Sequence, residues 1–396
     1  MRTPYVIIAV LLVVLVPIGF AGDGGAGKDA ATEPSAPLPV IARRVEVLRN
    51  LRFTAVPKPV RVTASQARRD GLASLDRGYP EAARRADEAL YSRLGLLPEG
   101  TDLREVSGSI FGEQVAGYYD PRTKKLRIVE GAATAGRVLD EIVIAHELVH
   151  ALEDQRIEFD LEAAEASDDG GYAYRALLEG TATEVMYGYL GRHFDSEVAL
   201  GGLLGASFSA GGTGELPPFV LAGLLFPYQE GQTFVSELYR RGGNGWTLVD
   251  LAGKVRPPVS TEQILHPQKW IAAEVPDPVR VPSPGRGWRR LTGGTFGEWQ
   301  TGQLLAVSGR AHPDAAKGWG GDSYALYRRG DQDVLVMRWR WDSRRDAQEF
   351  LPVLRAAIAE MPSRGAVKVR PDGVETTVAF APGEALAAQL AGARAG

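Results

Sequence analysis

The segment VIAHELVHAL (residues 143–152) constrains this chain more than any other, because it places two of the protein's five histidines four residues apart. Apolar residues recur with a period near 3.6 across residues 138–155, which predicts a single helix. His146 and His150 then project from one face of that helix, and Glu147 stands one position further round. Two imidazoles in this arrangement can hold one zinc ion and leave positions for a third ligand and a water molecule.

Glu147 has the placement of a general base and not of a ligand. Neutral imidazoles bind Zn²⁺, the metal lowers the pKa of its water towards 7, and a neighbouring carboxylate takes the proton as that water attacks a carbonyl. The alternative is a solvated histidine pair on a surface helix, which the apolar residues on both sides of the motif disfavour. Charged residues along the same helix place it in a soluble domain and not in a membrane span.

A catalytic zinc site usually has three protein ligands, and the absence of cysteine from the sequence leaves a carboxylate as the natural third. The segment YAYRALLEGTATEVMYGYL (residues 172–190) predicts a second helix, in which Glu179 is followed by the small residues Gly180–Thr183. We expect these small residues to let this helix lie close against the first. Glu184 is the rival ligand, about 140° away round the helix axis. Solvent exposure of both glutamates is the remaining alternative.

The motif H-E-x-x-H followed by a separate Glu-Gly-x-Ala helix resembles the gluzincin metallopeptidases, which include thermolysin and the zinc aminopeptidases. The resemblance covers roughly residues 110–190. It implies a zincin fold with an edge strand at residues 115–119 that pairs with an extended peptide substrate. It also implies that Asp154 orients a ligand histidine and that Glu147 is the base. The zinc ligands that it implies are His146, His150 and Glu179.

This sequence departs from the thermolysin pattern in the 29 residues that separate His150 from Glu179, a longer gap than is typical. It also lacks the aminopeptidase pattern that binds a free N-terminus. The resemblance therefore implies the reaction and not the substrate specificity. Just before the motif, VAGYYDPRTKKLRIVEG predicts a hairpin that turns at Asp120–Lys124, and two amphipathic helices precede it.

Two segments after the zinc motif leave alternatives open. In PPVSTEQILHPQKW a short helix that begins at Ser260 or Thr261 ends at His266. Zinc peptidases often place a His or Tyr donor against the oxyanion, and this block is similar to one in exported bacterial proteins assigned as peptidases. We therefore name His266 as a candidate catalytic residue, although it is equally suited to filling a turn. Residues 200–243 are apolar and glycine-rich, then helical from about Gln229, and predict either a substrate lid or a packing segment.

The N-terminus predicts export. Arg2 precedes an apolar run that ends near Ala21, so residues 1–21 form a signal peptide or a retained membrane anchor. Residues 22–39 have almost no apolar content and predict a flexible linker. We expect the rest of the chain outside the cytoplasm, secreted or held at the outer face of the membrane. A net charge of −4 excludes the basic footprint of nucleic-acid binding.

The predicted architecture is α+β, with a zincin-like metallopeptidase domain at residues 40–284 and a small α+β domain at residues 285–396 that has no catalytic motif of its own. The predicted function is that of an exported zinc-dependent peptidase acting on peptide or protein substrates. Two other functions remain open. One is a catalytically silent zincin fold that binds or scaffolds outside the cytoplasm. The other is a zinc hydrolase of a non-peptide amide.

Overall fold

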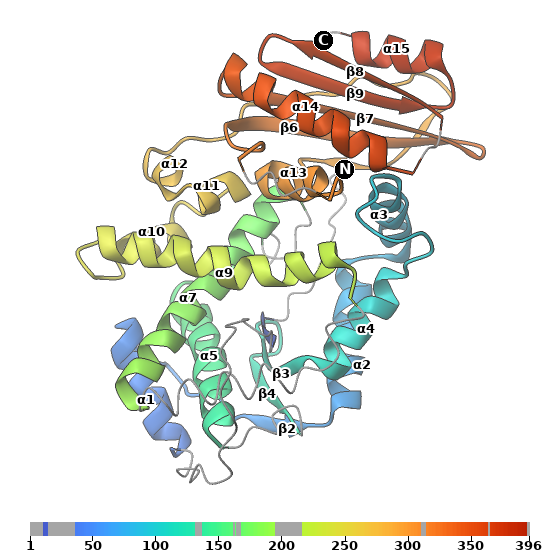
Figure 1. The fold of residues 1–396 in the computed structure, drawn as a ribbon. Helices are drawn as coiled ribbons and strands as arrows, with labels where there is room; N and C mark the ends of the chain where they lie inside the picture. Colours follow the sequence, from blue (N-terminus) through green and yellow to red (C-terminus); the bar gives the residue numbers. More distant parts are fainter. Residues whose placement is uncertain are drawn as a thin grey trace, which may run out of the picture.

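The computed structural model describes residues 11–14, 36–130, 137–160, 163, 168–194, 216–309, 314–362 and 365–393. The protein is mixed α+β, with two sheets that lie in different regions of the molecule (Figure 1). The expected signal-peptide cleavage site and residues 22–35 of the expected linker lie outside the described residues. Of the apolar N-terminal run, Leu11–Val14 are described, as strand β1. No helix within the described part of the chain is long and apolar enough to cross a membrane.

The N-terminal region is built around a four-stranded sheet of order β1-β3-β4-β2. Its further elements are α1 (Leu38–Arg49), β2 (Val60–Val62), α2 (Ala64–Gly78), α3 (Glu81–Arg93), α4 (Leu103–Glu113), β3 (Val115–Asp120), β4 (Lys125–Val129) and α5 (Arg137–Arg156). The predicted hairpin is confirmed, because β3 and β4 pair antiparallel from Gly117 opposite Ile128 to Asp120 opposite Lys125. The Asp120 carboxylate accepts hydrogen bonds from the turn and holds it closed.

Strand β3 is not the free edge that the sequence predicted. The chain's own residues Leu11–Val14 pair with it antiparallel on the side away from β4. A sequence pattern identifies a strand but not what covers its edge, because a distant segment can supply the neighbour. The observation also shows that this side of β3 accepts an extended segment.

The central helix α7 (Asp169–His193) packs against both α5 and α9 (Pro218–Arg241), below the five-stranded sheet in Figure 1. Helix α9 begins eleven residues before the predicted start at Gln229 and contains Pro227 in its interior. The first half of α9 is almost entirely apolar and so shows no amphipathic period. An internal proline also normally indicates a helix end. For these two reasons the sequence did not predict the first half of this helix. The short helices α10 (Thr247–Lys254), α11 (Thr261–Leu265) and α12 (Pro267–Ile271) follow.

Glycines set the spacing between α7 and α9. A Cβ atom added at Gly180 would lie 2.2 Å from the backbone of Gly231, and one added at Gly231 would lie 2.1 Å from the carbonyl oxygen of Ala176. The two backbones are therefore in direct contact at this crossing. The small residues after Glu179 were expected to face α5, and that expectation is wrong for Gly180. Adjacent residues point about 100° apart on a helix, so Glu179 and Gly180 face different neighbours.

The C-terminal region is a five-stranded antiparallel sheet of order β5-β6-β7-β9-β8. Its elements are β5 (Arg289–Gly294), α13 (Gly297–Ala306), β6 (Trp319–Arg329), β7 (Gln332–Trp341), α14 (Arg344–Glu360), β8 (Ala366–Asp372), β9 (Glu375–Ala381) and α15 (Glu384–Gly392). In β7, Leu335 and Met337 join the core cluster that includes residues of α14, whereas Val334 and Val336 join the cluster that includes residues of α15. Helices therefore cover both faces of β7.

Candidate metal centre

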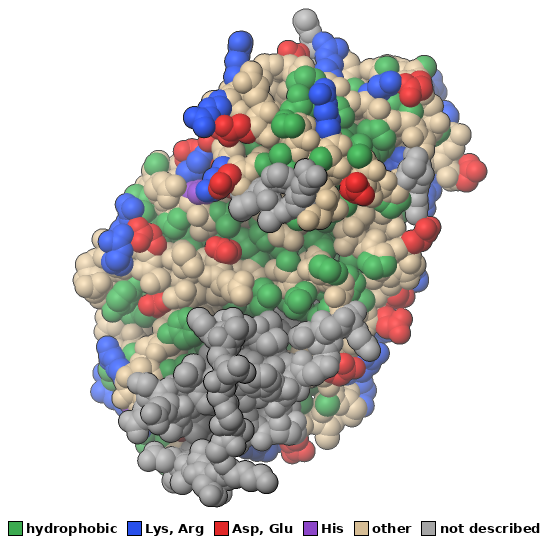
Figure 2. All heavy atoms as spheres, viewed as in Figure 1, with side chains coloured by type: hydrophobic (Ala, Val, Ile, Leu, Met, Phe, Trp, Pro, Cys, Tyr) green, Lys and Arg blue, Asp and Glu red, His purple; other side chains and the backbone are tan. Residues whose placement is uncertain are grey.

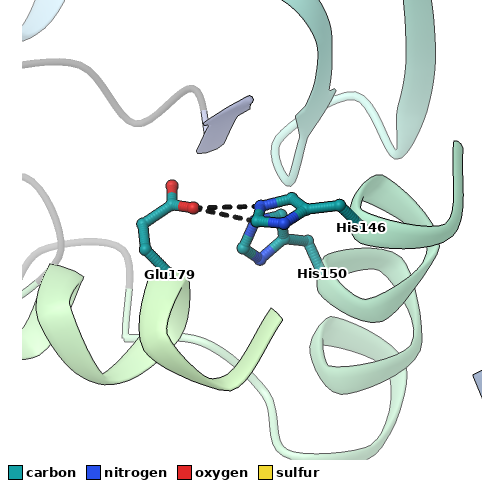
Figure 3. A group of neighbouring side chains, drawn as sticks. All are labelled: His146, His150 and Glu179. Carbon is teal, nitrogen blue, oxygen red and sulfur yellow. Dashed lines mark hydrogen bonds and ion pairs between the residues drawn. The ribbon is translucent and has the colours of Figure 1, made fainter. Parts of the chain in front are cut away.

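Three buried side chains from two helices converge on one point (Figure 3). The Nε2 atoms of His146 and His150 are 3.1 Å apart. Oε2 of Glu179 lies 3.2 Å from the first of these nitrogens and 3.3 Å from the second. Each of the three residues is at most 5% exposed. The sequence predicted this juxtaposition, and the structure brings the three residues together.

These separations fit a single small cation. Ligand atoms about 2.0–2.2 Å from a tetrahedral zinc ion lie about 3.3–3.6 Å from one another. Two unprotonated imidazole nitrogens at 3.1 Å repel each other unless a proton or a cation lies between them. Burial lowers the pKa of His146, which favours the neutral imidazole that binds metals. Burial alone raises the pKa of Glu179, but His150 and His146 outweigh it and lower that pKa below its usual value.

Helix α5 is held tightly against the sheet one turn before the histidines. A Cβ atom added at Gly117 of β3 would lie 2.7 Å from the side chain of Val143. Only glycine allows this approach, so β3 is fixed beside the start of the helix face that carries the histidines. Glu147, the predicted base, follows His146 on α5 and is fully buried. The site thus forms on a buried helix whose histidine-bearing part lies next to one strand and one neighbouring helix.

The structure separates Glu179 from its rival Glu184. The Glu184 carboxylate accepts a hydrogen bond of 2.7 Å from Gln232 Nε2 on α9. It therefore faces α9, and Glu179 faces the histidines of α5. The angle of about 140° between the two positions on one helix accounts for this division.

Asp154 does not contact a histidine, which corrects the role suggested by the resemblance. Its carboxylate accepts hydrogen bonds of 2.7 Å from Tyr119 Oη and from Lys124 Nζ, so it ties α5 to the hairpin. Nδ1 of neither His146 nor His150 has a hydrogen-bond partner among the described residues. The predicted aspartate–histidine hydrogen bond is therefore absent.

A carboxylate that the sequence did not single out lies on the same side of α5 as His150. Glu153 is buried and pairs with the equally buried Arg49 of α1 at 2.7 Å. Arg49 also reaches Asp250 of α10 at 2.5 Å and lies over the Trp246 ring. Burial raises the pKa of Glu153, and its charge interacts with both Arg49 and His150. The pair joins α1, α5 and α10 behind the histidines.

His266 lies away from the cluster, which corrects its assignment as a catalytic residue. Its Nε2 is 2.9 Å from Glu298 Oε1 of α13, and this hydrogen bond raises the pKa of His266. The preceding helix α11 is bonded to the first residue of α7 through Thr261 and Asp169. Ten residues of α7, a rise of about 15 Å, separate that anchor from Glu179. His266 caps a joint between helices, the alternative that the sequence left open.

Tyr228 of α9 is a neighbour of the cluster that sequence reasoning missed. Its ring centroid lies 6.2 Å from that of His146. The sequence indicated only that Tyr228 lies in residues 200–243, the segment predicted to be either a substrate lid or a packing segment. Once α9 is recognised as a helix that crosses α7 at Gly231, Tyr228 falls one turn before the crossing and beside the metal-binding face.

A second group of three carboxylates, Glu262, Glu274 and Asp342, is already neutralised. The ammonium group of Lys269 lies 2.5–2.7 Å from an oxygen of each. A lysine in this position supplies the positive charge that a metal would bring. Within the described residues the histidine–glutamate cluster is thus the centre at which a cation fits.

Comparison with known proteins adds one finding. Residues 288–394 match a family model described as a domain of unknown function, DUF8575. No curated protein and no solved structure matches this chain. The match covers most of the C-terminal region and none of the histidine–glutamate cluster, so it leaves the function to be argued from the site.

Proposed function

We propose that this protein is an exported zinc-dependent peptidase with a zincin-like core, and that His146, His150 and Glu179 hold the zinc ion. The observation that carries the proposal is their convergence, with ligand atoms 3.1–3.3 Å apart in a buried site. Two nitrogens and one carboxylate oxygen are the donors of a catalytic zinc site with an open fourth position. When bound, zinc supplies Lewis-acid polarisation of a carbonyl and activation of water.

The residues of the chain divide the remaining work. Glu147 precedes the second histidine by three positions and is buried, so it is suited to receive a proton from water and to return it to the leaving amine. Tyr228, with its ring 6.2 Å from that of His146, is better placed than His266 to donate a hydrogen bond to a developing oxyanion. Residues 11–14 occupy the outer edge of β3 as an antiparallel neighbour, so a peptide would bind there by strand addition only in place of that segment.

Export, by signal peptide or membrane anchor, stays a prediction from residues 1–21. A fusion of the first 40 residues to a reporter that is active only outside the cytoplasm should give signal. A reporter that remains cytoplasmic would contradict this part of the proposal.

The decisive experiment measures zinc in the purified protein and in matched variants by mass spectrometry. We expect about one equivalent in the wild type and its loss in His146→Ala. Glu179→Ala should weaken zinc binding severely and Glu184→Ala only mildly in a chelator competition. Equal zinc in the wild type and in His146→Ala would refute the site.

Glu147→Gln separates catalysis from metal binding. We expect it to retain zinc and to lose most of the hydrolysis of a peptide library, because only proton transfer is removed. Zinc loss in this variant would make Glu147 a ligand. A zinc-loaded wild type that cleaves no peptide would favour the scaffolding function.

A further inference from the structure

Net charge is divided unequally between the two regions of this protein. Residues 285–396 contain 16 Lys and Arg against 12 Asp and Glu, a net charge of +4, although the whole chain has a net charge of −4. The remaining residues therefore have a net charge of −8. Lys and Arg side chains stand out from the C-terminal region at the top of the molecule in Figure 2. A polyanionic surface would attract this region and repel the rest, and so would fix which side of the protein faces it.

Much of this positive charge lies at one edge of the five-stranded sheet. Strand β5 is an outer strand of that sheet, and its first residue, Arg289, pairs with Arg328 near the end of β6. The start of β5 and the turn between β6 and β7 therefore lie side by side. We call Arg286, Arg289, Arg290 and Arg329 the basic edge. All four side chains are exposed, and among the residues that the structure describes no ion pair neutralises any of them.

The acidic residues beside the basic edge are too few to cancel its charge. The Asp333 carboxylate of β7 accepts hydrogen bonds of 2.7 and 2.9 Å from Arg328, so it is already paired. Asp331, in the turn between β6 and β7, is exposed. The four arginines of the basic edge, Arg328 and these two aspartates together have a net charge of +3.

Local packing holds the basic edge in place. The Arg329 guanidinium lies over the Trp288 ring, 4.5 Å from its centroid, in a cation–π contact. Trp288 in turn packs against the apolar cluster that includes residues of α15. A Cβ atom added at Gly287 would lie 3.7 Å from the Arg329 side chain, so the segment before β5 lies against the same arginine. The charges are therefore carried by a hydrogen-bonded strand pair and its turn, which keeps them together.

The directions of the arginines indicate the shape of the partner. Arg289 and Arg290 are consecutive strand residues, so their side chains point to opposite faces of the sheet. A single small anion would meet one face only, whereas a planar array of phosphates lying across the edge would meet both. An anionic phospholipid surface is such an array, and residues 1–21 are expected to bring the chain to a membrane. Arginine suits this partner because its planar guanidinium donates two hydrogen bonds to one phosphate.

We propose that the basic edge docks the C-terminal region on an anionic phospholipid surface. The proposal goes beyond the peptidase function and does not depend on the metal centre. It gives a role to the segment that matches the domain of unknown function, because Arg289, Arg290 and Arg329 lie within residues 288–394. The alternative is that these charges only keep the outer edge of β5 from pairing with another chain, in which case they bind no lipid.

The test measures co-sedimentation of the full-length protein with vesicles of phosphatidylcholine, alone or with phosphatidylglycerol, at about 0.1 M salt. The apolar N-terminal run is the same in every variant, so the ratio of the two partition coefficients isolates the effect of lipid charge. An arginine near an anionic surface contributes about fivefold to binding. The ratio should be well above 1 in the wild type, and Arg289→Gln combined with Arg329→Gln should lower it about 25-fold.

The matched control is Arg344→Gln combined with Arg345→Gln at the start of α14. It removes the same charge from the same region, but the ten residues of β7, about 30 Å of strand, separate it from the turn of the basic edge. Because the Debye length at this salt concentration is about 10 Å, we expect the control to change the ratio less than about twofold.

Three results would overturn the proposal. A wild-type ratio near 1 would mean that the arginines only protect the edge of β5. An equal loss in the control would mean that net charge alone attracts the protein to the vesicles. Release of the protein by inorganic phosphate, at an ionic strength where sodium chloride has no effect, would identify a site for a single anion. Zinc content and peptide hydrolysis should be the same in all variants, so none of these results bears on the proposed peptidase function.

Discussion

The replacement Asp87→Asn tests a buried carboxyl group on α3. Asp87 of α3 accepts hydrogen bonds from Tyr79 Oη at 2.6 Å and from Thr292 Oγ1 of β5 at 3.0 Å, so it joins the two regions of the protein. Burial raises the pKa of Asp87 from 3.8 to about 7, against the opposing effect of these hydrogen bonds. Asparagine keeps the shape and the accepting oxygen but cannot ionise.

The sign and the magnitude follow from the pKa. A carboxyl group whose pKa is higher in the folded than in the unfolded protein stabilises the fold below the unfolded value, and this contribution is lost as the pH rises through about 7. Each pKa unit corresponds to about 1.4 kcal/mol. Between pH 5 and pH 8 the wild type should therefore lose about 2–3 kcal/mol, relative to Asp87→Asn, in the free energy of unfolding.

Urea unfolding of both proteins at pH 5, 6, 7 and 8 measures this difference. The exposed turn residue Asp331, replaced by Asn, serves as the control and should show no such trend. Parallel stability curves for wild type and Asp87→Asn across this range would refute the reasoning, because they would mean that Asp87 stays ionised in the folded protein.

Three other predictions concern the scaffold of the site. Gly180→Ala should destabilise the protein by about 1–3 kcal/mol and weaken zinc binding, because the added methyl group meets the α9 backbone. The control Gly191→Ala places its methyl group in open space and should have neither effect. Arg49→Met should lower the free energy of unfolding by about 3–5 kcal/mol at pH 8, because it leaves the Glu153 carboxylate buried without its partner. The loss should be smaller at acidic pH, where Glu153 can protonate. The control Arg85→Met, at an exposed ion pair, should change the stability little. Zinc at 100 times its Kd should raise the free energy of unfolding by about 2.7 kcal/mol in wild type and not in His146→Ala, as thermal melts would show.

The histidine pair of the candidate metal centre was predictable because its geometry is local. Residues four apart on a helix share a face whatever surrounds the helix, which places His146 beside His150. The same rule shows that Glu179 and Glu184 cannot both reach one point. The packing of α7 could not be derived from the sequence, and Gly180 contacts α9 where α5 was expected.

The predictions that were wrong all depend on contacts between distant segments. Asp154 has the spacing of a histidine partner, but Tyr119 and Lys124 of the hairpin bind its carboxylate, and no helix rule anticipates them. His266 was singled out by its residue type, and its partner Glu298 comes from another region of the chain. In the sequence, Arg49 is one of several polar residues of an amphipathic helix, and nothing near it indicates that it is buried. Its burial depends on partners in α5 and α10.

The N-terminal end of helix α7 is held by α11 and by α13 of the C-terminal region. Its first residue, Asp169, is bonded to Thr261 of α11, and a Cβ atom at Gly297 of α13 would collide with the Asp169 carboxylate. Glu179 lies about 15 Å further along the same helix than Asp169. A tilt of roughly 4° at the anchor would move its carboxylate by about 1 Å, and a displacement of that size can cost about 100-fold in rate. We therefore expect substitutions in α11 or α13 that leave His146, His150 and Glu179 intact to change the proposed peptidase activity, by altering the angle at which α7 is held.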